Sequence, residues 1–172
     1  MKRGGFCPLF FQFYIGMGKS KYNVSSDTEK RTCNNIVFDS VIEMKYYRDV
    51  VLPEWGSGNI LSFELQKPYV LQPKFIHDGK TVKEITYVAD FYIEYADGRI
   101  EVIDIKGMPD SVAKIKRKMF WYIYPDIDYK WICYSKIDGG WCEYDYVLRR
   151  RQERKRNRKR KTGKTVPEDR PF

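Results

Sequence analysis

Two runs of alternating apolar and polar residues, joined by Ala96-Asp97-Gly98, constrain the fold of this chain more than any other feature. Apolar side chains stand at every second position from Ile85 to Tyr95, within residues 81–95, and residues 99–106 also alternate between apolar and charged side chains, which is the pattern of β-strands. Glycine in the third place of a three-residue loop favours a hairpin in which that glycine is left-handed. The sequence therefore predicts an antiparallel hairpin, with the odd-numbered residues from Ile85 to Tyr95 on one face.

The register of this hairpin decides how two acidic side chains are placed. A three-residue loop pairs Tyr95 with Arg99, and this sets Asp90 opposite Asp104. A two-residue loop would pair Asp90 with Ile105 and point its side chain away, because one step of register exchanges the faces. The first register is preferred because its other pairs are apolar: Phe91 with Ile103, and Ala89 with Ile105.

Directly opposed carboxylates repel each other and destabilise a sheet unless a cation lies between them. Mg²⁺, for which Mn²⁺ can substitute, takes oxygen ligands and lowers the pKa of a bound water. Lys106 shares a face with Asp104, so its amine can orient or deprotonate such a water and offset the charge of a phosphate. In the alternative interpretation, both acids lie on a solvated sheet face and Lys106 pairs with one of them.

The remaining elements predict one α/β (α+β) domain with a mixed sheet flanked by helices. Ser40 and Glu43 form a capping box for a helix of about a dozen residues, which Pro53 and Gly56 end. Asp110 or Ser111 begins a second helix that reaches about Tyr124. Further strands are expected at residues 60–65, 69–75, 129–134 and 141–147, with a break at Lys67-Pro68 and a hairpin tip at residues 77–80.

Histidine and cysteine usage excludes several classes of enzyme. His77 is the single histidine, and the four cysteines include no C-x-x-C pair. Zinc sites and Ser-His-Asp or Cys-His catalysis are therefore disfavoured, and no zinc is expected. We expect the cysteines to be reduced thiols and the protein to be cytoplasmic. We expect no membrane segment, because the ten apolar residues near the N-terminus cannot span a bilayer.

Positive charge is concentrated at the C-terminal end. Residues 149–164 hold eleven basic side chains and one acidic one, whereas residues 1–148 carry 20 of each sign. Such a segment is too charged to bury, and we expect a disordered or DNA-induced helical arm that binds nucleic acid by counterion release. An RNA-binding arm has the same composition.

Four segments, taken in order, resemble the PD-(D/E)XK nuclease superfamily. They are residues 37–43, 65–75, 85–91 and 102–107, which carry Glu43, Asp90 and the triplet Asp104-Ile105-Lys106. The sequences of these segments are similar to those of a phage-encoded family of uncharacterised nucleases related to endonuclease I-type Holliday-junction resolvases. The resemblance covers about residues 19–135. Two departures are Asp104, where many members have Glu, and Ala89, where the nominal motif has proline.

The resemblance implies a restriction-endonuclease-like core and a role for each motif residue. Asp90 and Asp104 would bind the metal, the carbonyl of Ile105 would add a ligand, Lys106 would serve the water, and Glu43 would complete the site or hold a second ion. Gln66 and Gln72 fall where some relatives place polar contacts to substrate or to the metal shell, although each is equally a strand-edge residue.

Basic side chains supply the candidate nucleic-acid surface. Lys114, Lys118 and Trp121 share one face of the second predicted helix and can hold a phosphate strand and a base, although a solvated face has the same pattern. In the tail, the candidate residues are Arg149, Arg150, Arg151, Arg154, Lys155 and Arg156.

These features predict three parts: an extension over residues 1–18, a nuclease-like domain over residues 19–148 and a basic tail over residues 149–172. The leading hypothesis is a Mg²⁺-dependent endonuclease acting on branched DNA in phage replication or recombination within the bacterial cytoplasm. By resemblance, it would work as a homodimer. A non-catalytic nucleic-acid-binding protein of the same fold, within a phage assembly, is the alternative, and an RNA-directed nuclease would share every feature.

Overall fold

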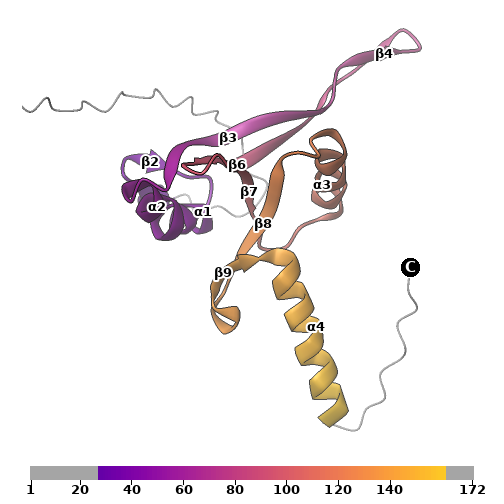
Figure 1. The fold of residues 1–172 in the computed structure, drawn as a ribbon. Helices are drawn as coiled ribbons and strands as arrows, with labels where there is room; N and C mark the ends of the chain where they lie inside the picture. The colour runs from indigo at the N-terminus through magenta and orange to yellow at the C-terminus, as the bar shows by residue number, and fades with distance from the viewer. Residues whose placement is uncertain (1–26, 162–172) are drawn as a thin grey trace, which may run out of the picture.

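The computed structural model describes residues 27–161, which form a mixed α+β fold around a five-stranded sheet (Figure 1). The predicted extension over residues 1–18 and the tail beyond residue 161 lie outside the described residues. The sheet order is β3-β6-β7-β8-β9. The bounds of these strands are Ile60–Gln72, Ile85–Tyr95, Ile100–Ile105, Asp128–Ser135 and Gly140–Glu143 respectively. Only β7 and β8 are parallel within this sheet, and α3 (Ser111–Ile123) connects them.

The central hairpin has the predicted three-residue loop and register. Gly98 takes the left-handed conformation with φ of 84°, and the Tyr95 N–H donates to the Arg99 carbonyl at 2.9 Å. Phe91 lies opposite Ile103. The prediction that a three-residue loop sets the pairing of β6 and β7 is therefore confirmed.

The first predicted helix forms as three consecutive segments: α1 (Val41–Tyr46), the π-helical turn η2 (Tyr47–Val51) and α2 (Leu52–Gly56). Its N-terminus is capped as expected, because Ser40 Oγ accepts the Glu43 N–H at 3.2 Å. The prediction that Pro53 stops the helix is wrong. A proline ring crowds the carbonyl four residues earlier, and the preceding π turn, in which the Leu52 N–H reaches the Tyr47 carbonyl, relieves this conflict.

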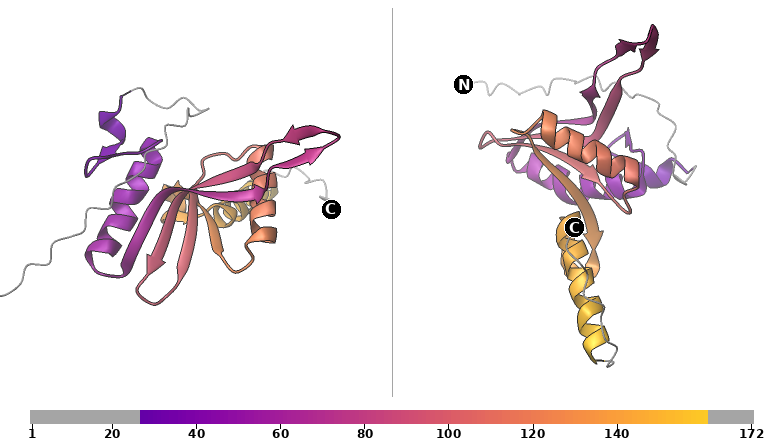
Figure 2. Two further views of the ribbon diagram at one scale, coloured as in Figure 1. Left: turned by 90° about the horizontal axis from the view of Figure 1, so that it is seen from above. Right: turned by 90° about the vertical axis from the view of Figure 1, so that its right-hand side faces the viewer.

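An arm extends from one edge of the sheet (Figures 1 and 2). Strand β3 runs through the break predicted at Lys67-Pro68, because a proline is tolerated in an edge strand. The tip comprises β4 (Phe75–His77) and β5 (Lys80–Val82), which turn at Asp78-Gly79 as predicted. The predicted strand over residues 81–95 is thus divided between β5 and β6.

Helices lie on both faces of the sheet (Figure 2), and an apolar layer lies beneath them on each face. The first lies beneath α1 and η2, where Tyr47 and Val51 pack with Phe91. The second lies beneath α3, where Phe120 packs with Tyr87. Between residue 27 and α1, the structure has three short elements: η1 (Glu29–Arg31), β1 (Thr32–Cys33) and β2 (Ile36–Val37).

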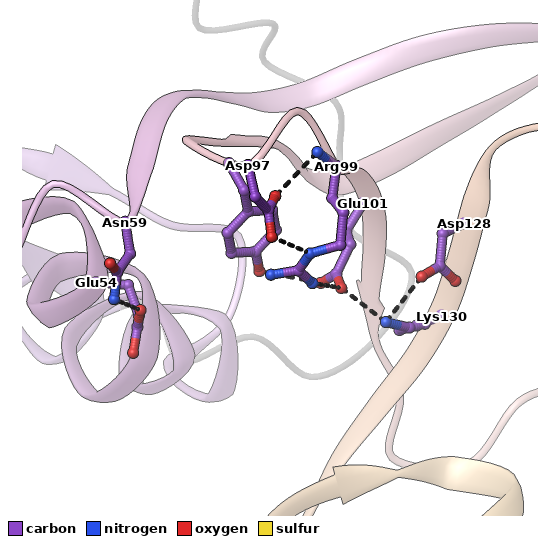
Figure 3. Close-up of polar contacts among 8 residues, drawn as sticks. Glu54, Asn59, Asp97, Arg99, Glu101, Asp128 and Lys130 are labelled. Atoms are coloured by element: carbon purple, nitrogen blue, oxygen red, sulfur yellow. Dashed lines mark hydrogen bonds and ion pairs between the residues drawn. The ribbon is translucent and has the colours of Figure 1, made fainter.

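An ion-pair network closes the end of β7 that lies next to the hairpin loop (Figure 3). Glu101 is buried, and its carboxylate binds Lys130 at 2.7 Å and Arg99 at 3.1 Å. Asp97 and Asp128 bind the same two cations from the other side. Because Arg99 and Lys130 neutralise its charge, Glu101 has a structural role. It is separate from Asp104, which lies near the other end of β7.

The C-terminal helix α4 (Tyr144–Lys161) projects away from the sheet as a rod (Figure 1). Two predictions are corrected here. Residues 144–147 are helical instead of extended, and residues 149–161, which the sequence predicts to be disordered or to become helical on DNA, already continue that helix in the protein alone. The helix is anchored at its base by buried Val147. About one and two turns further on, Arg150 and Arg154 reach Asp138 in the 3-10 turn η3 (Lys136–Asp138), and Arg154 Nη2 donates to it at 3.0 Å.

We expect Asp138→Asn to loosen α4, because the substitution removes the charge that gathers the two arginines. The measurement is limited trypsin digestion under native conditions, with cleavage sites after Arg149–Arg151 mapped by mass spectrometry. Cleavage there should accelerate several-fold relative to the control Asp126→Asn, which changes an exposed acid outside these contacts. Equal digestion of both variants would show that Asp138 does not hold the helix.

Candidate functional site

The side chains of Asp90 and Asp104 meet where the β6–β7 pairing ends. The last regular pair is Phe91 with Ile103, so the two aspartates are the next residues along each strand. Oδ2 of Asp90 accepts the N–H of Ile105 at 2.7 Å, and the Asp104 carboxyl group lies close enough to raise the pKa of Asp90. The predicted convergence of these two acids is present in the structure.

The expected single apolar face of β6 is not present. Phe91 packs in the layer beneath α1, whereas Ala89 packs in the layer beneath α3. The faces exchange at Asp90, and the prediction that the odd-numbered residues share one side is wrong. The neighbouring strand changes face at the same level, because Gln66 of β3 has φ of 54°. This paired irregularity is the local feature that accompanies the turn of Asp90 toward Asp104.

Asp104 is enclosed by polar and aromatic groups from β7 and β8. Its side chain is only 3% exposed, and Lys106 Nζ binds it at 2.6 Å. The Tyr129 hydroxyl lies 3.5 Å from the same oxygen and in turn accepts the indole N–H of Trp131. Lys106 Nζ also lies 5.8 Å from the centre of the Trp131 ring. The buried carboxylate of Asp104 thus lies beside the ammonium of Lys106 and the aromatic side chains of Tyr129 and Trp131.

Glu43 provides a third carboxylate, from the first turn of α1, and it is buried. Its Oε1 accepts the Ser40 hydroxyl at 2.6 Å. Burial raises the pKa of Glu43 to about 7, and the charges of Asp39 and Asp104 act in the same direction, while the bond from Ser40 opposes them. Glu43, which caps α1, therefore interacts electrostatically with Asp90 and Asp104.

The protonation of the cluster follows from its geometry. Burial, and then the charges of Asp104 and Glu43, raise the pKa of Asp90 well above its usual range. Burial alone lowers the pKa of Lys106, but the three carboxylates outweigh it and raise that pKa above its ordinary value. Lys106 is therefore an ammonium at neutral pH, whereas Asp90 keeps its proton to a higher pH than an ordinary aspartate.

The donor set suits a hard divalent cation. Three carboxylates and the Ile105 carbonyl are all oxygen ligands, the kind that Mg²⁺ and Mn²⁺ take. The arrangement is not preformed, however: within residues 27–161, no group of three or more acids, cysteines or histidines is disposed to hold a metal ion. Asp104 would have to turn from Lys106, and Asp90, whose pKa is raised, would have to lose its proton.

The two candidate glutamines are placed differently. Gln66 lies between the pairs Leu65–Phe91 and Lys67–Ala89, at the level of Asp90. Gln72 pairs with Ile85, and five residues of strand, about 16 Å, separate that position from Asp90. Only Gln66 is therefore near the carboxylates.

Helix α3 carries the predicted basic face beside the site. Lys114, Lys118 and Trp121 are exposed. Arg117, which the sequence did not single out, lies inward of them, 4.4 Å from the Trp121 ring and 4.2 Å from the Trp131 ring. Its guanidinium binds Asp145 of α4 at 2.7 Å. A second cation thus lies over the indole that Lys106 approaches.

The candidate residues of the tail fall into two groups on α4. Arg150 and Arg154 bind acids: Asp138 in both cases, and Glu153 as well for Arg150. The other four are exposed: Arg149, Arg151, Lys155 and Arg156.

Arg117, Tyr129 and Trp131 are the neighbours of the site that sequence reasoning missed. The period of two in β8 puts Tyr129 and Trp131 on one face. Their position beside Asp104 depends on the parallel pairing of Asp104 with Trp131, which requires knowing that α3 crosses over the sheet.

The chain belongs to a protein family described as "Protein of unknown function (DUF1064)", which matches residues 19–138. No curated protein matches the sequence. None of the helices within residues 27–161 has the length and apolar character needed to cross a bilayer.

We expect Glu43→Gln to stabilise the metal-free protein at alkaline pH. Because the pKa of Glu43 is raised on folding, the folded state binds its proton more tightly, and the free energy of unfolding falls as pH rises from about 4.5 to about 7. The substitution removes that loss, on the order of 3 kcal/mol at pH 8 and little at pH 4. Urea unfolding in EDTA at both pH values measures this. Equal effects at both would refute it.

Proposed function

We propose that this protein is a metal-dependent endonuclease that hydrolyses DNA phosphodiester bonds on a PD-(D/E)XK core. One observation carries the proposal: Asp90 of β6 and Asp104 of β7 meet beside Lys106 at the end of one strand pair, and the buried Glu43 of α1 acts electrostatically on both. Uncompensated acids destabilise a fold, and the Glu101 network in the same strand illustrates how a purely structural acid is neutralised (Figure 3).

Each residue has a chemical role in this proposal. Asp90, Asp104 and Glu43, with the Ile105 carbonyl, would hold Mg²⁺ or Mn²⁺. When bound, such an ion acts as a Lewis acid and lowers the pKa of water. Lys106, as an ammonium, would orient the attacking water and offset the charge of the phosphate. Tyr129 and Trp131 keep bulk water from Asp104, so these charges act in a poorly screened environment.

The nucleic acid would be bound by the exposed basic residues of α3 and α4. The resemblance to junction-resolving endonucleases suggests branched DNA, a homodimer with two active sites, and a phage enzyme acting in the bacterial cytoplasm. A non-catalytic nucleic-acid-binding protein is the second candidate. The Lys106–Asp104 pair favours it, because it already neutralises one acid.

Cleavage is expected to require Asp104 and Lys106. With Mg²⁺, the protein should nick or cut DNA, and Asp104→Asn or Lys106→Gln should lower the rate by at least about 100-fold. The matched controls are Glu101→Gln and Lys130→Gln, which alter the equivalent lysine–carboxylate pair at the other end of the strand. Substrates are a four-way junction, a linear duplex, single-stranded DNA and RNA, each with Mg²⁺ or EDTA.

The outcomes of this assay are separable. Cleavage that survives in Asp104→Asn would place the activity elsewhere or in a contaminant. Binding without cleavage by the folded wild-type protein, together with no increase in melting temperature on adding Mg²⁺ or Mn²⁺, would favour the non-catalytic candidate. Cleavage of RNA alone would assign the substrate to RNA.

Removal of residues 149–172 is expected to weaken DNA binding and reduce its dependence on salt. The deletion leaves the first residues of α4, including Val147, and removes the part of the helix that carries the basic side chains. Each phosphate contact contributes about 0.9 to the slope of log affinity against log salt. Fluorescence anisotropy at several salt concentrations measures the slope, and residual cleavage is expected at low salt. Full affinity after the deletion would place DNA recognition in the body of the protein.

A further inference from the structure

Arg117 has an environment that a surface ion pair does not need. Its side chain is only 13% exposed, and its guanidinium lies between the rings of Trp121 and Trp131. The Nε atom is buried without a hydrogen-bond partner. Stacking of this kind holds a planar guanidinium in a fixed orientation, which is the arrangement used for bidentate recognition of carboxylates and phosphates.

The acid that occupies Arg117 is accessible to solvent. Both terminal nitrogens of the guanidinium contact Asp145, at 3.2 and 2.7 Å, but the Asp145 side chain is 54% exposed. Because Asp145 is half-exposed, its carboxylate can return to water. An anion that takes its place keeps the guanidinium of Arg117 paired with a negative charge.

The position of Arg117 relates it to the carboxylate site. Lys106 and Arg117 both lie near the ring of Trp131, and Lys106 contacts Asp104. Exposed Lys114 and Lys118 lie on the same helix. A nucleic-acid strand whose phosphate reached Lys106 would pass neighbouring phosphates close to Arg117.

We propose that Arg117 is a phosphate-binding residue for the nucleic-acid backbone, and that Asp145 occupies its guanidinium until the phosphate replaces it. The inference rests on the proposed function in taking DNA as the ligand. In binding, the Asp145 ion pair breaks, two charge-assisted hydrogen bonds form to phosphate oxygens, and the indole rings hold the guanidinium in place throughout.

The test is a double-mutant cycle measured by fluorescence anisotropy with a labelled DNA duplex in EDTA, so that no cleavage intervenes. Arg117→Gln should weaken binding several-fold and lower the salt slope by about 1. Asp145→Asn should strengthen binding about threefold by removing the competitor. In the Arg117→Gln background, the same Asp145→Asn change should have little effect, because no guanidinium remains to be released.

Glu153→Gln is the matched control, since Glu153 lies on the same helix and is 55% exposed. Its effect on DNA binding should be the same with and without Arg117. An Asp145→Asn effect that is also equal in both backgrounds would overturn the proposal, because it would reflect general charge alone. The proposal would also be overturned if Asp145→Asn lowered the melting temperature and left DNA binding unchanged or weaker. The ion pair between Arg117 and Asp145 would then only hold α4 against α3.

Two safeguards keep the result interpretable. If Arg117→Gln does not fold, the comparison of Asp145→Asn with Glu153→Gln in the wild-type background decides, and equal effects refute the proposal. Failure of the proposed function is read separately, from cleavage with Mg²⁺. A protein that cuts DNA without this coupling refutes the role of Arg117, whereas coupling without cleavage refutes the nuclease function alone.

Discussion

The close approach of the Asp90 and Asp104 carboxyl groups, fixed where Asp90 accepts the Ile105 N–H, is the constraint around which the rest of the site is arranged. Two carboxyl groups so close cannot both ionise without mutual repulsion, and Glu43 adds a third acid to the same region. The folding free energy that offsets this arrangement comes from the aromatic packing on the two sides of the sheet, around Phe91 and Phe120. A cation with oxygen ligands complements such a cluster without any change of fold.

The sequence is sufficient to predict the hairpin, because Gly98 dictates its loop, and the start of α1, because Ser40 and Glu43 cap it. It does not reveal the exchange of faces at Asp90. Ala89 and Phe91 are both apolar, so the alternation continues unbroken through the irregularity. On the neighbouring strand, Gln66 takes a left-handed conformation that glutamine seldom adopts. Only the packing of two layers on opposite sides fixes this feature.

The C-terminal segment illustrates a different limit. Its charge predicts a segment that is not buried, and most of its described residues are exposed. Lysine, arginine, glutamine and glutamate are also good helix formers, so the same composition is compatible with a helix. The balance is tipped by tertiary contacts at the base of α4, from Val147 and from Asp138 to Arg154. Asp138 lies in a turn 16 residues before Arg154, and neither composition nor helical periodicity connects them.

Trp131 gives the two cations of the site a common property. Lys106 and Arg117 each contact an acid, Asp104 and Asp145 respectively, and each also lies near this indole. An ammonium or guanidinium that loses its carboxylate keeps the attraction of the ring, which is strongest where water is excluded. In the proposed enzyme, the carboxylate of Asp104 can therefore turn to a metal ion, and Asp145 can yield to a phosphate, while both cations stay in position to meet the nucleic-acid backbone.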